Sequence, residues 1–280
     1  MDRVVNDLIQ ELEDEGEGDN TIIFFYSDHG TGLPRHKRWL FDTGVKVPLI
    51  VYIPETFKKL YPAEPGSEID RLVSFIDLAP TVLKLADAKI PKTMQGNAFL
   101  SKELIPEREY VHVARGRMDE RYDMQRGLRT KKFKYLRYYE PNKPFIQFMN
   151  TPESGPLMTE LRKAEKTQNL SKEAQQLVAP VKPKESLFDL EKDPFEFNDL
   201  AKNPDYQSKL IELREAHNQW MYNILDVGLI PEAIIRGWEK SKNKPIYQIL
   251  REDSSFYNDL MLTSSSNNEK FLQNCLKHPN

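Results

Sequence analysis

The stretch that decides the fold is TIIFFYSDHG at residues 21–30. Its first six residues are mostly apolar on both faces, as in a central parallel strand that helices cover on either side. Before it, residues 2–15 carry apolar side chains at helical spacing and acidic side chains on the other face, and residues 15–20 break this pattern. A helix followed by a buried strand is half of an α/β unit, so the sequence predicts an α/β fold here.

Outward from this stretch, the pattern first continues and then changes. Residues 47–53 form a second apolar run that is typical of a strand, and residues 75–88 have apolar positions that predict a helix. The segments that follow predict short antiparallel strands at 111–114, 125–130 and 133–139, the last two forming a hairpin. This change from α/β to antiparallel β predicts a domain boundary near residue 105.

The remainder of the chain divides into an irregular segment and several helices. Residues 140–184 are rich in proline, lysine and glutamine with weak periodicity, which favours a long excursion packed over a surface. A short strand is expected at 187–190 and helices at 204–225, 231–240 and 267–276. We therefore expect an α/β part at 1–105, a smaller β-rich part at 106–235 and a helical tail at 236–280, which could begin a set of helical repeats.

Composition excludes several classes of protein. The chain has 280 residues with 43 acidic and 40 basic side chains, a net charge of −3, whereas a general nucleic-acid binder would show a basic surplus. No apolar run approaches the length of a membrane span. Its one cysteine, Cys275, rules out an internal disulfide and a cysteine-based zinc site. The compartment stays open on these grounds.

The segment Ser27-Asp28-His29-Gly30 carries the chemistry that the sequence suggests. It follows a buried strand, and open α/β sheets bind ligands at the carboxyl ends of their strands. An aspartate held there suits a metal ion, and the cations at 35–38 (Arg35, His36, Lys37, Arg38) suit an anion such as sulfate or phosphate. Two structural alternatives remain open: the Asp-His pair could cap a turn, and the cations could be a solvated face.

Three separated motifs resemble the sulfatase family of the alkaline-phosphatase superfamily. They are DNTIIFFYSDHGTGLPRHKRWLFDTGVKVPLIV at 19–51, RMDERYDMQRGLRTKKFKYLRYY at 117–139 and ESLFDLEKDPFEFNDLAKNP at 185–204. The resemblance extends over roughly residues 2–235, and the spacing of Pro34 and Lys37 is similar to the sulfamidase-like (heparan N-sulfatase-like) branch. It implies the C-terminal part of an alkaline-phosphatase-like α/β/α sandwich, followed by a small antiparallel-β C-terminal subdomain with helices.

The resemblance also implies roles for single residues. Asp28 matches a metal-ligating aspartate, and His29 occupies the adjacent position, which faces both metal and sulfate. Lys37 matches the cation that binds the sulfate and its bridging oxygen, while His36 and Arg38 are expected at the rim. The metal in this family is usually calcium, although another divalent cation would fit, and a hard cation prefers oxygen ligands.

Weaker candidates lie in the C-terminal subdomain. His112, Arg115 and Arg117 could reach over the cleft and bind the sugar, or they could form a solvated hairpin edge. Gly127, Arg129 and Asp189 are expected to be structural, and His217 to be a surface or packing residue.

The family's nucleophile is absent from residues 1–280. It is a formylglycine made from cysteine or serine in a Cys/Ser-x-Pro-x-Arg motif, and no such motif occurs. We therefore expect the N-terminal half of the catalytic domain to lie outside this chain, and the complete protein to be periplasmic or secreted. The predicted function is hydrolysis of sulfate esters or sulfamates, with sulfated glycans as the default substrate. The alternatives are a phosphomonoester or phosphonate hydrolase of the same superfamily, and a non-catalytic remnant or binding module.

Overall fold

The computed structural model describes residues 1–101, 103, 106–117 and 120–265. Its N-terminal part contains α1 (Asp2–Asp14), β1 (Ile23–Tyr26), α2 (Asp42–Val45), β2 (Leu49–Tyr52) and α3 (Leu78–Leu85). Its C-terminal part contains the strands β3 (Val111–Arg115), β4 (Gln125–Arg129), β5 (Phe133–Tyr138) and β6 (Glu185–Asp189). The helices α4 (Asn150–Glu153), α5 (Pro156–Lys166) and α6 (Lys172–Val178) lie between β5 and β6. The last described helices are α7 (Gln207–Ile224), α8 (Glu232–Lys242), α9 (Ile246–Glu252) and α10 (Ser255–Ser265).

The N-terminal part confirms the mixed α/β prediction but not the expected strand environment. Within the described residues β1 pairs only with β2, and the pairing is antiparallel, with Ile23 opposite Tyr52 and Phe25 opposite Ile50. These four side chains share one face of the ribbon, and on it Ile50 is 59% and Tyr52 51% exposed. The prediction of a parallel strand covered on both faces is therefore wrong for the described residues.

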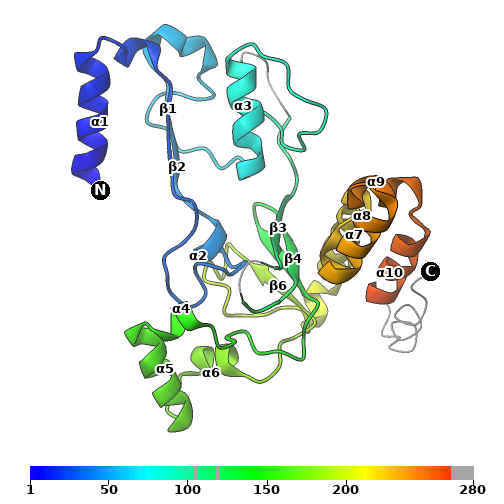
Figure 1. Cartoon of the computed structure of the whole chain (residues 1–280). Coiled ribbons are helices and arrows are strands. Elements are labelled where there is room, and N and C mark those ends of the chain that lie inside the picture. The colour runs from blue at the N-terminus through cyan, green and yellow to red at the C-terminus, as the bar shows by residue number, and fades with distance from the viewer. Residues whose placement is uncertain (102, 104–105, 118–119, 266–280) are drawn as a thin grey trace.

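The other face of the ribbon is covered by the segment that includes α3. Phe24 contacts Phe99 with 6.4 Å between ring centres, and Tyr26 contacts Phe75 at 5.4 Å. The helix α1, predicted correctly from its periodicity, lies apart from the ribbon and buries none of its residues (Figure 1). A run that is apolar on both faces needs a layer on each side, and the described residues supply one of them.

The C-terminal part is built on a four-stranded antiparallel sheet in the order β3-β4-β5-β6, which includes the predicted hairpin. One face packs against α7 through side chains such as Leu128, Tyr135 and Leu213, all of them fully buried. The opposite face carries Leu136 and Tyr138, which belong to a second cluster with residues of α5 and α6. Figure 1 shows α4–α6 and α7–α10 on different sides of this sheet.

The segment at 140–184 and the C-terminal tail hold more helix than predicted. Weak periodicity suggested an irregular excursion at 140–184, yet α4, α5 and α6 form there because Met158 and Leu177 bury against the sheet. The helices α9 and α10 lie within the helical tail predicted at 236–280, although their bounds were not predicted. The helix predicted at 267–276 lies outside the described residues.

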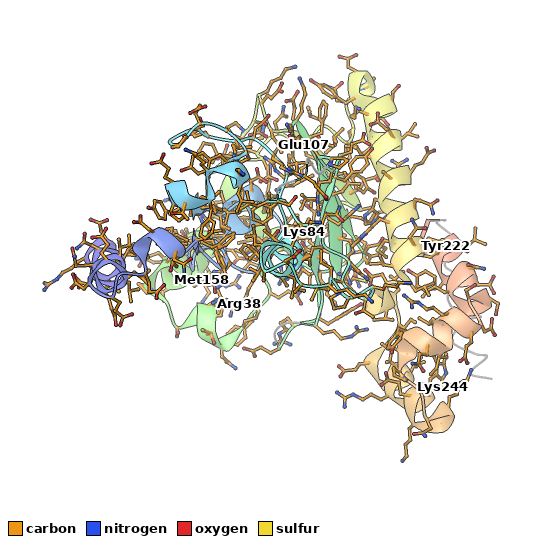
Figure 2. The ribbon with its side chains drawn as sticks, turned by 90° about the horizontal axis from the view of Figure 1, so that it is seen from above. Arg38, Lys84, Glu107, Met158, Tyr222 and Lys244 are labelled. Carbon is orange, nitrogen blue, oxygen red and sulfur yellow. The ribbon has the colours of Figure 1, made fainter. Side chains whose placement is uncertain are left out.

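The two parts of the chain share one core. Trp39, Leu40 and Phe41 directly follow residues 35–38, which we call the basic loop. All three are buried in the cluster that contains Leu136 and Phe188. Seen from above, Arg38 and Met158 both lie on the side of the sheet away from Tyr222 of α7 (Figure 2). The basic loop is thereby fixed to the C-terminal sheet.

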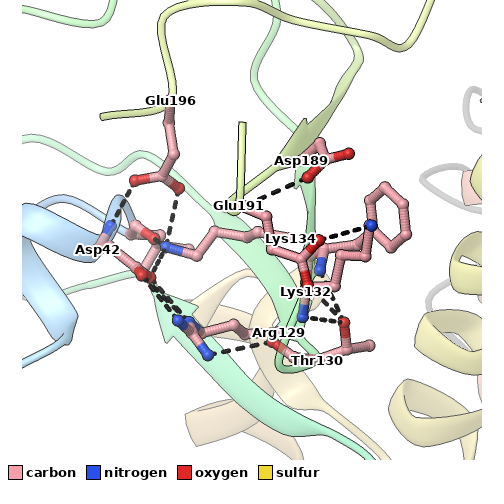
Figure 3. A network of polar contacts seen from close by, with 10 residues as sticks. Asp42, Arg129, Thr130, Lys132, Lys134, Asp189, Glu191 and Glu196 are labelled. Atoms are coloured by element: carbon pink, nitrogen blue, oxygen red, sulfur yellow. Dashed lines mark hydrogen bonds and ion pairs between the residues drawn. The ribbon is translucent and has the colours of Figure 1, made fainter. Parts of the chain in front are cut away.

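A buried ion network reinforces this junction (Figure 3). The Lys134 ammonium, fully buried, lies 2.5 Å from Asp42 Oδ1 and 2.8 Å from Glu196 Oε1, and it donates to the carbonyl oxygen of Leu40 at 3.0 Å. Arg129 donates to both carboxylate oxygens of Asp42 at 3.0–3.1 Å. Burial alone would raise the pKa of Asp42, but Lys134 and Arg129 outweigh it and hold that pKa below its usual value. Burial raises the pKa of Glu196 in spite of Lys134.

Replacing Lys134 should strongly destabilise the protein. Lys134→Ala would leave Asp42 and Glu196 buried with one cation fewer, and breaking a buried ion pair in this way costs about 3–5 kcal/mol of unfolding free energy. Lys132→Ala is the matched control, because its 2.6 Å pair with Glu191 is exposed and should matter little. Urea denaturation of both variants measures the difference, and equal midpoints would contradict a structural role for the buried network.

Candidate functional site

Asp28 and His29 lie side by side immediately after β1. The Asp28 side chain is 81% exposed, and its Oδ2 lies 3.2 Å from His29 Nε2. His29 Nδ1 is 2.7 Å from the carbonyl oxygen of Gly30, and Ser27 Oγ donates to the carbonyl oxygen of His29 at 2.8 Å. A carbonyl oxygen only accepts hydrogen bonds, so Nδ1 carries the proton and Nε2 keeps its lone pair when the ring is neutral. A lone pair and a carboxylate oxygen therefore face each other, and both are groups that can bind a cation.

This donor set fits a metal ion only in part. A calcium ion takes six to eight oxygen ligands, and Asp28 supplies one carboxylate. Among the described residues, no group of three or more histidine, cysteine, aspartate or glutamate side chains is placed to hold a metal. Asp28 and His29 can thus contribute two ligands, and the remaining ligands would have to come from elsewhere.

The basic loop folds tightly beside these two residues. Gly30 N–H donates to the carbonyl oxygen of Gly44 at 3.0 Å, and a Cβ at Gly30 would lie 1.9 Å from the carbonyl oxygen of Thr43, so only glycine fits. Lys37 N–H donates to the carbonyl oxygen of Thr31 at 2.9 Å. The side chains of His36, Lys37 and Arg38 are all partly buried, and His36 Nδ1 is 3.0 Å from Thr31 Oγ1. Within the described part of the chain, the Lys37 ammonium forms no ion pair, which leaves it able to bind an anion.

The three sugar-binding candidates are engaged in contacts inside the C-terminal part. The ring of His112 stacks on Trp220 with 4.3 Å between centres. Arg115 is only 7% exposed, and its Nη1 lies 3.6 Å from Asp123 Oδ2. Arg117 donates to the carbonyl oxygens of residues 227, 228 and 230. These contacts favour structural roles, and sugar binding by the three residues stays a prediction.

The half-buried His112 and the fully buried His217 form a pair of histidines between the sheet and α7. Burial, with a smaller contribution from Arg108, lowers the pKa of His112 to about 4. His217 is fully buried with Nε2 at 3.0 Å from Tyr139 Oη, and burial, followed by His112 and Arg137, lowers its pKa to about 3. His217 is thus a packing residue, one of the two predicted alternatives.

A family model and several known proteins resemble this chain in sequence. The family model described as "Sulfatase" matches residues 1–88. An ulvan-active sulfatase of Formosa agariphila is 40% identical over 248 residues, which cover 88% of this chain and 41% of that protein. The N-acetylglucosamine-6-sulfatase of Bos taurus is 41% identical over 106 residues, covering 36% of this chain and 18% of that protein. The chain thus spans about two fifths of the ulvan-active relative.

Solved structures resemble the fold. A 2-O GAG sulfatase matches with a TM-score of 0.56 and 22% identity over 80% of this chain and 41% of that one. A protein solved with its substrate D-glucosamine-2-N,6-O-disulfate matches with a TM-score of 0.51 and 20% identity over 79% of this chain and 38% of that one. At these identities the matches establish the fold, which is the alkaline-phosphatase-like fold that the sequence predicted.

The buried histidine pair should make stability depend on pH. Both pKa values are lowered in the folded protein, so below about pH 6.5 the unfolded chain binds protons that the folded chain does not. Unfolding free energy should therefore be retained above pH 6.5 and fall toward pH 4, by up to about 1.4 kcal/mol per pH unit for each histidine.

The test is urea denaturation between pH 5 and pH 7.5. The double variant His112→Gln/His217→Gln should show a shallower pH dependence than the parent, whereas the control His36→Gln, in the basic loop, should keep the parent slope. An unchanged slope in the double variant would show that other groups control acid stability.

Proposed function

Because this chain is related to the sulfatases over most of its length, we propose that it forms the C-terminal part of a sulfatase that hydrolyses sulfate esters or sulfamates. The observation that carries this proposal is the placement of Asp28, His29 and Lys37 on one tightly folded loop after β1. Sulfated glycans are the proposed substrate class, because the relatives include an ulvan-active sulfatase and N-acetylglucosamine-6-sulfatases. Assignment to the sulfamidase-like branch stays a prediction.

The proposed chemistry divides between this chain and residues outside it. Asp28, with His29 beside it, would hold a divalent cation, proposed to be calcium, and such a cation polarises sulfate oxygens when bound. Lys37 would donate to the sulfate and to the bridging oxygen, which neutralises charge on the leaving group. The nucleophile, proposed to be formylglycine, is not available from residues 1–280, because no Cys/Ser-x-Pro-x-Arg motif occurs there.

The proposed setting of the complete protein is the periplasm or the extracellular space. Within the described residues, none of the helices has the length and apolar character needed to cross a bilayer.

Removing the Lys37 ammonium should impair turnover much more than removing its neighbour's guanidinium. In an active sulfatase that carries this sequence, Lys37→Ala should lower kcat by about 10²–10³, the scale of losing one transition-state stabiliser. Arg38→Ala should lower it much less. Steady-state kinetics on a sulfated substrate measure both, and equal losses would show that Lys37 is not the sulfate-binding cation.

Residues 1–280 by themselves should have no sulfatase activity. They lack the nucleophile motif, and they bring only Asp28 and His29 as metal ligands, so affinity for calcium should be weak. We also expect poor solubility, because Ile50 and Tyr52 leave an apolar sheet face exposed. The assay uses a chromogenic aryl sulfate with added calcium. Turnover above background that Asp28→Ala abolishes would contradict this expectation and require a different nucleophile.

A further inference from the structure

The turn at residues 193–198 has no role in the function proposed so far, although it belongs to the third sequence motif. It reads Asp193-Pro194-Phe195-Glu196-Phe197-Asn198 and follows β6. Asn198 N–H donates to Asp193 Oδ2 at 2.7 Å, and Glu196 has a φ of 58°. The left-handed backbone at Glu196 is uncommon for a residue other than glycine, and such conformations persist where surrounding contacts impose them.

Arg35 of the basic loop supplies one set of those contacts. Its guanidinium carbon lies 3.8 Å from the ring centre of Phe41 and 4.6 Å from that of Phe197, so the cation contacts both aromatic rings. Its Nη2 donates to the carbonyl oxygens of Phe195 at 2.6 Å and Glu196 at 3.0 Å. Arg35 is partly buried, and burial lowers the pKa of its guanidinium. We call this set of contacts the Arg35 clamp.

The carboxylate of Glu196 holds the start of α2, the helix that follows the basic loop. Its Oε2 accepts a hydrogen bond from Asp42 N–H at 2.5 Å, and its Oε1 lies 2.8 Å from the buried Lys134 ammonium. One turn of the chain therefore holds Arg35 in the basic loop and Asp42 at the start of α2, about 160 residues away in sequence.

Lys37 lies between fixed points on both sides. Arg35 precedes it by two residues, and the Arg35 carbonyl oxygen also accepts a hydrogen bond from Thr43 Oγ1 at 2.5 Å. Trp39 follows Lys37 by two residues and is buried in the core. The clamp thus limits how the backbone at Lys37 can move, which matters because a charge contact in catalysis depends on placement to a fraction of an ångström.

We propose that the 193–198 turn is a positioning element for the basic loop and that Arg35 is the residue through which it acts. The proposal rests on the proposed role of Lys37 as the sulfate-binding cation. Arg35 itself contacts no substrate in this account. Arginine is needed here because its guanidinium is planar and can lie against aromatic rings. A lysine ammonium has no flat face to place against the rings of Phe41 and Phe197, and it is not a planar fork of donors.

The first test measures the loop directly in the chain of residues 1–280. Hydrogen exchange by mass spectrometry, which needs little protein, compares a peptide covering residues 27–44 with one covering 123–139. Arg35→Lys should speed exchange in the loop peptide by about tenfold or more, the scale of losing a desolvated cation–π contact and its hydrogen bonds. The β4–β5 peptide should be unchanged. The control is Arg121→Lys, because Arg121 Nε also donates to a carbonyl oxygen, that of Phe148, but far from the loop in sequence.

The second test asks whether the clamp acts through Lys37. In an active sulfatase that carries this sequence, Arg35→Lys should lower kcat more than it changes KM. The double variant Arg35→Lys/Lys37→Ala should then be no slower than Lys37→Ala, because a positioning residue has no effect once its target is gone.

The outcomes separate this inference from the proposed function. Unchanged loop exchange in Arg35→Lys, or losses that add in the double variant, would overturn the positioning role. Faster loop exchange together with full activity in Lys37→Ala would support the clamp and overturn the role proposed for Lys37.

Discussion

The buried ammonium of Lys134 is the constraint on which the rest of the structure depends. It comes from β5, yet its carboxylate partners come from α2 and from the turn after β6, so one side chain ties together three distant segments. A buried charge is costly unless it is paired, and this requirement fixes α2 against the C-terminal sheet. Arg129 adds a second cation to the same carboxylate of Asp42. The basic loop immediately precedes α2 and inherits its position from this network.

The candidate site is therefore held by the C-terminal sheet as much as by the strand that precedes it. Trp39, Leu40 and Phe41 bury their side chains in that sheet's core, and Arg35 binds the turn beyond β6. Asp28 and His29, by contrast, follow β1, which pairs only with β2 among the described residues and shares with it a face on which Ile50 and Tyr52 are more than half exposed. The backbone around Lys37 is therefore well anchored, whereas the metal site proposed at Asp28 and His29 would need further ligands that the described residues do not provide. Such a division agrees with a chain that spans about two fifths of the ulvan-active sulfatase.

Charged residues inside the C-terminal part show how the fold itself can engage side chains for which a motif suggests a binding role. From the sequence, Arg115 and Arg117 were predicted to reach over a cleft, where their guanidinium groups could bind a sulfated sugar. In the structure Arg115 lies next to Asp123, and Arg117 donates to the carbonyl oxygens of residues 227 and 230. These contacts lie within the fold. The buried pair of Lys182 and Asp123, 2.7 Å apart, belongs to the same group of internal charges.

Local sequence was sufficient for the elements whose burial repeats with the period of a helix or strand. It predicted α1, the β4–β5 hairpin, α7 and the place of Asp28 and His29 after β1, because each depends on neighbours a few residues away. The sequence could also have indicated a buried role for Lys134, because Lys134 shares one face of its strand with Leu136 and Tyr138, and that face is buried. Only the tertiary structure decided the antiparallel partner of β1, the helices within 140–184 and the direction of Arg35. These features depend on contacts between segments up to about 160 residues apart in sequence. The periodicity of a short segment cannot indicate which charged group or aromatic ring of a distant segment will contact it.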